Sequence, residues 1–136
     1  MKTWIFACVS VLVFGLTVAA LANDEGDKYD AMFMKPAIAA NGAMQKDVMG
    51  DLGAAAMDAA KLQAAFANIE KFWAAKNVDD AVMFAKNIQK VAGDVKDAAG
   101  KGDKDGAVAA AKMIGANCGS CHMAHRMKTD AGFDLH

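Results

Sequence analysis

The sequence contains very little proline and very little cysteine. Of its 136 residues, one is proline and three are cysteine, and no segment alternates polar and apolar residues as a half-buried strand does. Cys8 lies in an N-terminal apolar segment, so two cysteines remain for the rest of the chain and no structural disulfide is expected. No cluster of basic residues indicates binding to nucleic acid. These absences favour a helical domain without cross-links.

Residues 1–22 have the three parts of a secretory signal peptide. Lys2 supplies a basic start, residues 5–21 form an almost unbroken apolar run, and the segment ends in Ala-Leu-Ala, a small-x-small cleavage site. A retained membrane anchor is the alternative, because the run approaches the length that spans a bilayer. We predict a signal peptide over residues 1–22 and one periplasmic domain over residues 23–136, with no membrane segment after cleavage. Loss of Lys2 lowers the number of basic side chains from 15 to 14, against 16 acidic ones.

Apolar residues recur at helical spacing in four segments of the mature chain. Pro36 interrupts the first segment, which predicts either a kink near residues 32–35 or a helix that begins at Pro36. The predicted helices cover residues 28–49, 53–76, 78–99 and 105–128, and residues 129–136 are expected to form a loose tail. Because the turns between these helices are short, we predict an all-α, up-down-up-down antiparallel four-helix bundle.

The same periodicity predicts which side chains face the core. In chain order they are Ala31, Met34, Ile38, Asn41, Met44 and Val48; Leu62, Phe66, Ile69 and Trp73; Ala81, Ala85, Ile88, Ala92 and Val95; and Ala107, Ala111, Ile114, Cys118, Cys121 and His125. Many of these are alanine, so the helices can approach closely but would bury few large side chains. A bound group would supply the missing apolar volume.

The most specific motif of the sequence is Cys118-Gly119-Ser120-Cys121-His122. Two thiols three residues apart lie one turn from each other on the same helix face, so each can add across a vinyl group of a single haem. His122 follows directly and can bring its imidazole to the iron from that face. The spacing is the attachment signature of a c-type haem, and it predicts one covalently attached haem c with His122 as the proximal ligand.

Other metal and redox sites are alternatives to haem. A dithiol redox couple of the thioredoxin type would follow a strand, whereas the residues before this motif are predicted to be helical. A zinc site would need more ligands, and the only other histidines are His125 and His136. His122, Met123, His125 and Met127 could instead hold copper. Residues 100–106 contain aspartates but lack the terminal glutamate of a calcium loop, which favours helix capping.

The position of this motif near the C-terminus of a four-helix bundle resembles the class II cytochromes c, the cytochrome c-prime family. The resemblance covers the architecture of the mature chain, and Cys118, Cys121 and His122 match the haem attachment and proximal ligand positions. Arg126 matches the basic residue that these proteins carry beside the proximal histidine. Phe33-Met34-Lys35 resembles the start of the first helix in low-spin members, where a methionine ligates the iron. The Arg-Gln pair of high-spin members is missing.

The predicted helix bounds also favour Met34 as the distal ligand. If the first helix starts near Lys28 and the fourth ends near Lys128, Met34 and His122 each lie six residues from one end of the bundle, about 9 Å in from it. Met32 and Met83 fall off the inward stripes. Met34 could alternatively pack against an open haem face without ligating the iron.

Further contacts with the haem are expected from the end of the second helix and from the residues after the motif. Phe66, Ile69 and Trp73 should pack on the haem, because the second helix ends at the level of His122. Arg126 should pair with a propionate or lower the basicity of the proximal imidazole, unless it is a solvated surface arginine. His125 is expected to be a neighbouring or partly exposed residue.

Three functions are compatible with the sequence. The first is a one-electron carrier that works with redox partner proteins and is not an enzyme. The second is a five-coordinate protein that binds NO or CO, and the third is a haem-free helical interaction protein whose cysteines form a local disulfide. The resemblance also leaves a homodimer open, because class II relatives often dimerise through their first two helices.

Overall fold

The computed structural model describes residues 25–130 and 132–136. The predicted signal peptide, residues 1–22, lies outside this described part, so it stays a prediction. Within the described part, none of the helices combines the length and the apolar character that a membrane-spanning segment needs.

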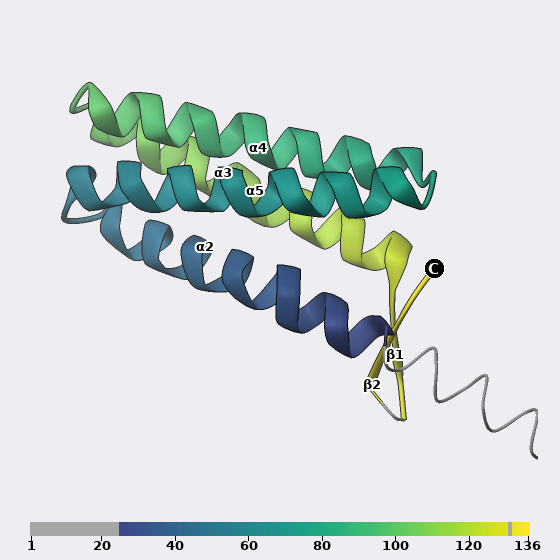
Figure 1. The fold of residues 1–136 in the computed structure, drawn as a ribbon. Helices are drawn as coiled ribbons and strands as arrows, with labels where there is room; N and C mark the ends of the chain where they lie inside the picture. Colours follow the sequence, from purple (N-terminus) through teal and green to yellow (C-terminus); the bar gives the residue numbers. More distant parts are fainter. Residues whose placement is uncertain (1–24, 131) are drawn as a thin grey trace, which may run out of the picture.

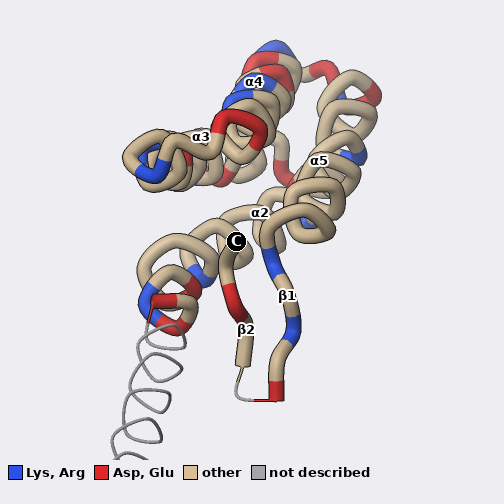
Figure 2. Tube along the Cα trace, turned by 90° about the vertical axis from the view of Figure 1, so that its right-hand side faces the viewer, with Lys and Arg blue, Asp and Glu red and all other residues tan. Residues whose placement is uncertain are grey.

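Four helices pack in an antiparallel arrangement that follows their order in the chain (Figure 1). They are α2 (Lys35–Asp47), α3 (Leu52–Ala75), α4 (Asp79–Gly100) and α5 (Lys104–His125). Contacts are extensive between α2 and α3, α3 and α4, and α4 and α5, but sparse between α2 and α5. Figure 2 views the bundle along its axis, from the end where α5 finishes. The predicted all-α four-helix bundle is confirmed.

Polar side chains and backbone turns fix the ends of the helices. The Asp51 carboxylate accepts a hydrogen bond from the Ala54 N–H at 3.0 Å, and the Asp103 carboxylate accepts one from the Gly106 N–H at 2.9 Å. Asp103 therefore has the predicted capping role. Asn77 has a φ of 58° and ends α3, while Val78 is the N-cap of α4. Asn77 therefore belongs to the end of α3, and α4 begins after Val78.

The chain enters the bundle through a wide helical turn. Residues 25–29 are helical, and Asp30–Met34 form the π-helix η1, in which the Lys35 N–H bonds to the Asp30 carbonyl five residues earlier. Pro36 follows at once. Proline lacks an N–H, and its ring would press on the carbonyl four residues before it in a regular α-helix. The helix is thus interrupted near Pro36 by a π-turn over residues 30–34, and α2 begins at Lys35, one residue before the start that was predicted as one alternative.

The predicted inward stripes of α3 and α4 are buried throughout, from Leu62 to Trp73 and from Ala81 to Val95. The stripe of the first helix is only partly correct. Tyr29 is buried in place of Ala31, because the π-turn shifts the helical phase before Met34. Ile38 is 62% exposed, because it lies toward the sparse contact between α2 and α5, while Ala37 and Ala40 occupy the core.

The chain after α5 forms a hairpin instead of the predicted helix end and loose tail. Strand β1 (Arg126–Thr129) pairs antiparallel with β2 (Gly132–Leu135), with Arg126 opposite Leu135. The Arg126 guanidinium lies 3.5 Å from the centre of the Phe133 ring, and the His136 N–H reaches the His125 carbonyl. These contacts hold the last residues against the end of the bundle and stop the helix at His125.

Candidate functional site

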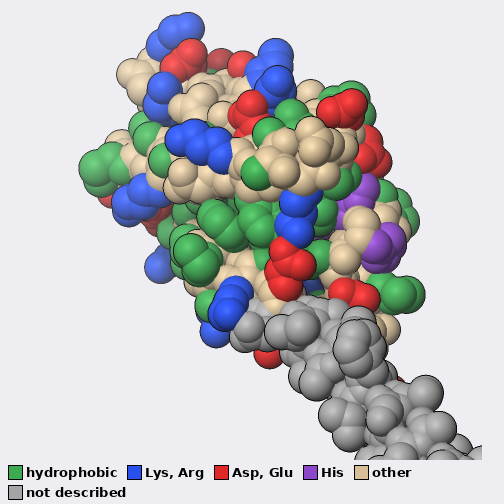
Figure 3. All heavy atoms as spheres, turned by 45° about the vertical axis from the view of Figure 1, so that its right-hand side comes forward, with side chains coloured by type: hydrophobic (Ala, Val, Ile, Leu, Met, Phe, Trp, Pro, Cys, Tyr) green, Lys and Arg blue, Asp and Glu red, His purple; other side chains and the backbone are tan. Residues whose placement is uncertain are grey.

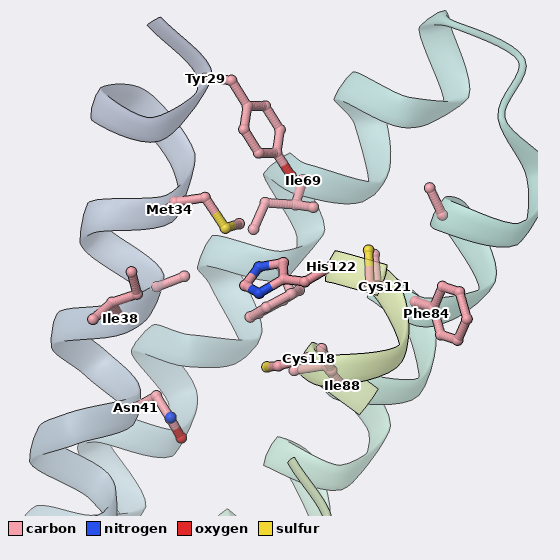
Figure 4. Close-up of a pocket in the computed structure, with 14 residues that line it drawn as sticks. Tyr29, Met34, Ile38, Asn41, Ile69, Phe84, Ile88, Cys118, Cys121 and His122 are labelled. Carbon is pink, nitrogen blue, oxygen red and sulfur yellow. The ribbon is translucent and has the colours of Figure 1, made fainter. Parts of the chain in front are cut away.

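A cavity of about 160 Å³ lies inside the bundle near the end that carries the hairpin, and all four helices contribute to it. Figure 4 shows its principal side chains. Its lining residues are Tyr29, Met34, Ala37, Ile38, Asn41, Phe66, Ile69, Ala81, Phe84, Ala85, Ile88, Cys118, Cys121 and His122. Most of this lining is apolar. The exposed Ile38 places one edge of the cavity at the sparse contact between α2 and α5.

The predicted attachment motif lies on the last turns of α5, and its three chemically active side chains line this one cavity. Cys118 and Cys121 are free, half-buried thiols. Burial raises the pKa of Cys118, and burial together with the neighbouring Cys118 and Asp80 raises the pKa of Cys121 to about 11. Both thiols are therefore protonated at neutral pH. In the described part of the chain no group of three His, Cys, Asp or Glu residues is arranged to hold a metal ion.

His122 presents a neutral imidazole to the cavity. Burial is the main cause that lowers its pKa, the positive charge of Arg126 lowers the pKa further, and Asp30 opposes both. A neutral imidazole has a free lone pair, which is the form that ligates a metal.

Met34 enters the same cavity from η1. Its side chain and the His122 ring point toward each other in Figure 4. Met34 is buried, whereas Met32 is 66% exposed and Met83 is 51% exposed. Of these three thioethers, only Met34 lines the cavity. The helix bounds behind its predicted level differ in the structure, because residues 25–29 are already helical and α5 ends at His125 instead of Lys128.

Of the three contacts predicted from α3, Phe66 and Ile69 line the main cavity, but Trp73 does not. Trp73 instead lines a small crevice beside the cavity, where Met34, His122 and Leu135 also lie. Its indole Nε1–H donates a hydrogen bond to the Tyr29 hydroxyl at 3.0 Å. Tyr29 therefore takes the place beside the cavity that was expected for Trp73.

Arg126 lies beside His122 and contacts other residues of the protein. Its guanidinium is 3.0 Å from the Asp30 carboxylate and lies over the Phe133 ring. The side chain lines the crevice next to His122. Of the two roles predicted for it, the electrostatic one is compatible with this geometry, since the charge of Arg126 lowers the pKa of His122.

His125 is buried, as its place on the predicted inward stripe indicated, and the alternative expectation of a partly exposed residue is wrong. Its Nδ1 lies 2.7 Å from the His136 carbonyl, its Nε2 lies 3.0 Å from the Asp80 carboxylate, and its ring packs on Trp73. Met123 is 83% exposed and Met127 is also exposed. A buried histidine and two exposed thioethers do not form the copper site that their spacing in the sequence could suggest.

The surface near the site is not a continuous apolar face. Apart from Ile38, the exposed large hydrophobic side chains of the described residues are all methionines. Figure 3 shows exposed hydrophobic side chains interspersed with charged ones, and histidines near one edge of this view.

Several residues of the site were missed from the sequence, among them Tyr29 and Phe84. Tyr29 lies five residues before Met34, a spacing that matches a π-turn but not an α-helix. Phe84 is three residues after Ala81 on α4, so the inward stripe of that helix could have indicated it. Taken together, two thiols, one imidazole and one thioether converge on an apolar cavity in a four-helix bundle. Comparisons of this chain with models of protein families, with curated proteins and with solved structures found no match.

Proposed function

We propose that this protein is an exported c-type cytochrome that carries single electrons on one covalently attached haem c. The observation that supports this proposal most strongly is that Cys118, Cys121 and His122 line one cavity, with Met34 on its opposite side. When bound, haem supplies the one-electron couple between Fe(II) and Fe(III). The chemistry of these four side chains suits such a group, because the two thiols can form thioethers while the imidazole and thioether ligate the iron.

The other lining residues determine the environment of that group. Phe66, Ile69 and Ile88 exclude water from the cavity, and a neutral thioether opposite an imidazole favours the less charged Fe(II) state. Both effects raise the reduction potential, as suits an electron carrier. Arg126 stays paired with Asp30 and adds positive charge near His122.

The proposed function includes no catalysed reaction. Its partners are redox proteins of the periplasm, where the predicted signal peptide would deliver the chain. A five-coordinate haem that binds NO or CO remains the alternative function, but a buried thioether inside the cavity favours six-coordinate iron.

The proposal is tested by producing the full chain together with a haem-attachment system. We expect a c-type spectrum that survives extraction with acidic acetone. Cys118→Ser and Cys121→Ser should each remove one thioether and shift the pyridine haemochrome band. Ser120→Ala, between the two cysteines, is the matched control and should leave the band in place. If both cysteine variants keep the wild-type band and retain haem, the assignment is wrong.

The spectrum also separates the alternatives. A low-spin ferrous spectrum agrees with the electron carrier, and a high-spin ferrous spectrum that changes on addition of CO would favour the gas-binding function. A chain that takes up no haem would support the haem-free interaction protein.

A further inference from the structure

Tyr29 is the only tyrosine of the chain, and it lies at the cavity wall. It immediately precedes η1, so the wide turn brings it onto the same side of the helix as Met34, five residues later. Only 6% of Tyr29 is exposed, and both residues line the main cavity as well as the crevice beside it. A phenolic hydroxyl is thus placed next to the predicted distal ligand.

The Tyr29 ring is packed among three other aromatic side chains. It packs against Phe72 with ring centres 4.7 Å apart, against Phe33 at 5.4 Å and against Trp73 at 5.7 Å. Its oxygen accepts the hydrogen bond from the Trp73 indole. The aromatic cluster formed by Tyr29, Phe33, Phe72 and Trp73 therefore anchors the phenol on α3.

The direction of the hydroxyl hydrogen follows from these contacts. An indole N–H can only donate, so the Tyr29 oxygen acts as an acceptor toward Trp73, and its own hydrogen needs a second partner. Among the hydrogen bonds of the described residues, the Tyr29 hydroxyl takes part in the one from Trp73. In Figure 4 the hydroxyl end of Tyr29 points toward the cavity beside Ile69 and the Met34 sulfur. Ile69 offers no acceptor, whereas a thioether sulfur is a weak one.

We propose that Tyr29 is a positioning residue for the distal ligand, and that its hydroxyl donates a hydrogen bond to the Met34 sulfur in the haem-loaded protein. This inference rests on the proposed function. The hydrogen bond draws electron density from the sulfur and so favours Fe(II) over Fe(III). It also connects the distal ligand through Tyr29 and Trp73 to α3, which restrains the side chain of Met34 after the π-turn.

The test compares the haem-loaded full chain with its Tyr29→Phe variant, which keeps the ring and removes only the hydroxyl. We expect the Fe(II)/Fe(III) ratio at a fixed ambient potential to fall about threefold to tenfold, the range of a single neutral hydrogen bond. A tenfold fall corresponds to about 59 mV for a one-electron couple. The near-infrared band from sulfur to iron should remain but change its wavelength.

Phe72→Leu is the matched control, because it disturbs the packing on Tyr29 without touching the hydroxyl. It should leave the Fe(II)/Fe(III) ratio and the band unchanged. Equal shifts in the two variants, or an unchanged ratio in Tyr29→Phe with the band intact, would overturn the role of Tyr29 and leave the proposed function standing. A haem-loaded wild-type chain without the band would overturn both the tyrosine's role and ligation by Met34.

Discussion

The two ends of the bundle are built from different residues. At the end where α2 meets α3 and α4 meets α5, the core consists of alanines with a few aliphatic side chains, and residues such as Ala55, Ala59 and Ala107 are fully buried. At the opposite end lie the cavity, the π-turn, the hairpin and every aromatic residue of the described part of the chain. We call these the alanine end and the cavity end.

This difference shows how one chain combines close packing with room for a bound group. Alanines let helix backbones approach each other, so the alanine end closes on itself. The large side chains of the cavity end hold the helices apart, and α2 and α5 touch only sparsely. The Gln45 amide donates a hydrogen bond to the Ala111 carbonyl at 2.8 Å and joins these two helices just beyond the cavity. The alanine end thus supports a site that it does not contain.

The largest effect that distinguishes the two ends should come from truncating large core side chains in the haem-free protein. Leu62 is fully buried outside the cavity, whereas Ile69 lines it. Leu62→Ala should lower the free energy of unfolding by about 3–5 kcal/mol, and Ile69→Ala by about 2–3 kcal/mol, because Ile69 already lacks neighbours on one side. Urea unfolding followed by circular dichroism measures both. Equal costs, or a larger cost at Ile69, would contradict the comparison.

A second effect is the fluorescence of the cavity end. Trp73 is the only tryptophan of the predicted mature chain, because Trp4 belongs to the predicted signal peptide. It is buried beside the cavity, so haem should quench most of its emission. The matched control is the haem-free double variant with Cys118→Ser and Cys121→Ser, which should emit strongly. Bright emission from intact, haem-loaded protein would place the haem away from Trp73.

The smallest effect is the pH dependence of the haem-free protein. The pKa of His122 is lowered in the folded state, mainly by burial, so the unfolded chain binds a proton more tightly than the folded one. The stability contributed by the neutral imidazole is therefore complete above the ordinary pKa of 6.5 and is lost as the pH falls through the lowered folded value. His122→Gln should flatten the decline of stability below pH 6.5. A variant with the same slope as the wild type would show that this imidazole does not titrate as the structure indicates.

The sequence predicted the alanine end better than the cavity end. The stripes of α3 and α4 follow the regular period of an α-helix, so the burial of Leu62 and Val95 could be read directly from their spacing. At the cavity end, Cys118, Cys121 and His122 could be singled out from their spacing on one helix, and the structure brings the three to one cavity.

The departures all lie at the cavity end, where tertiary contacts decide the local structure. Tyr29 was missed because a π-turn, and not an α-helix, relates it to Met34. The hairpin was missed because its two strands are only four residues long. It is held in place by contacts of Arg126 with the Phe133 ring and with Asp30, and neither contact follows from a periodic pattern in the sequence. Because Tyr29 was not expected in the core, the sequence also did not predict that Trp73 would pack behind it.

The measurement that tests the central claim most directly is the near-infrared absorption of the oxidised, haem-loaded chain. Ligation of iron by the Met34 thioether predicts a sulfur-to-iron charge-transfer band that is present in the wild type and absent in Met34→Ala. Met32→Ala, at a methionine that is 66% exposed two residues earlier, should keep the band. A wild-type protein without the band, or a Met34→Ala variant that retains it, would contradict the account of the cavity as a site with His122 and Met34 on opposite sides of one iron.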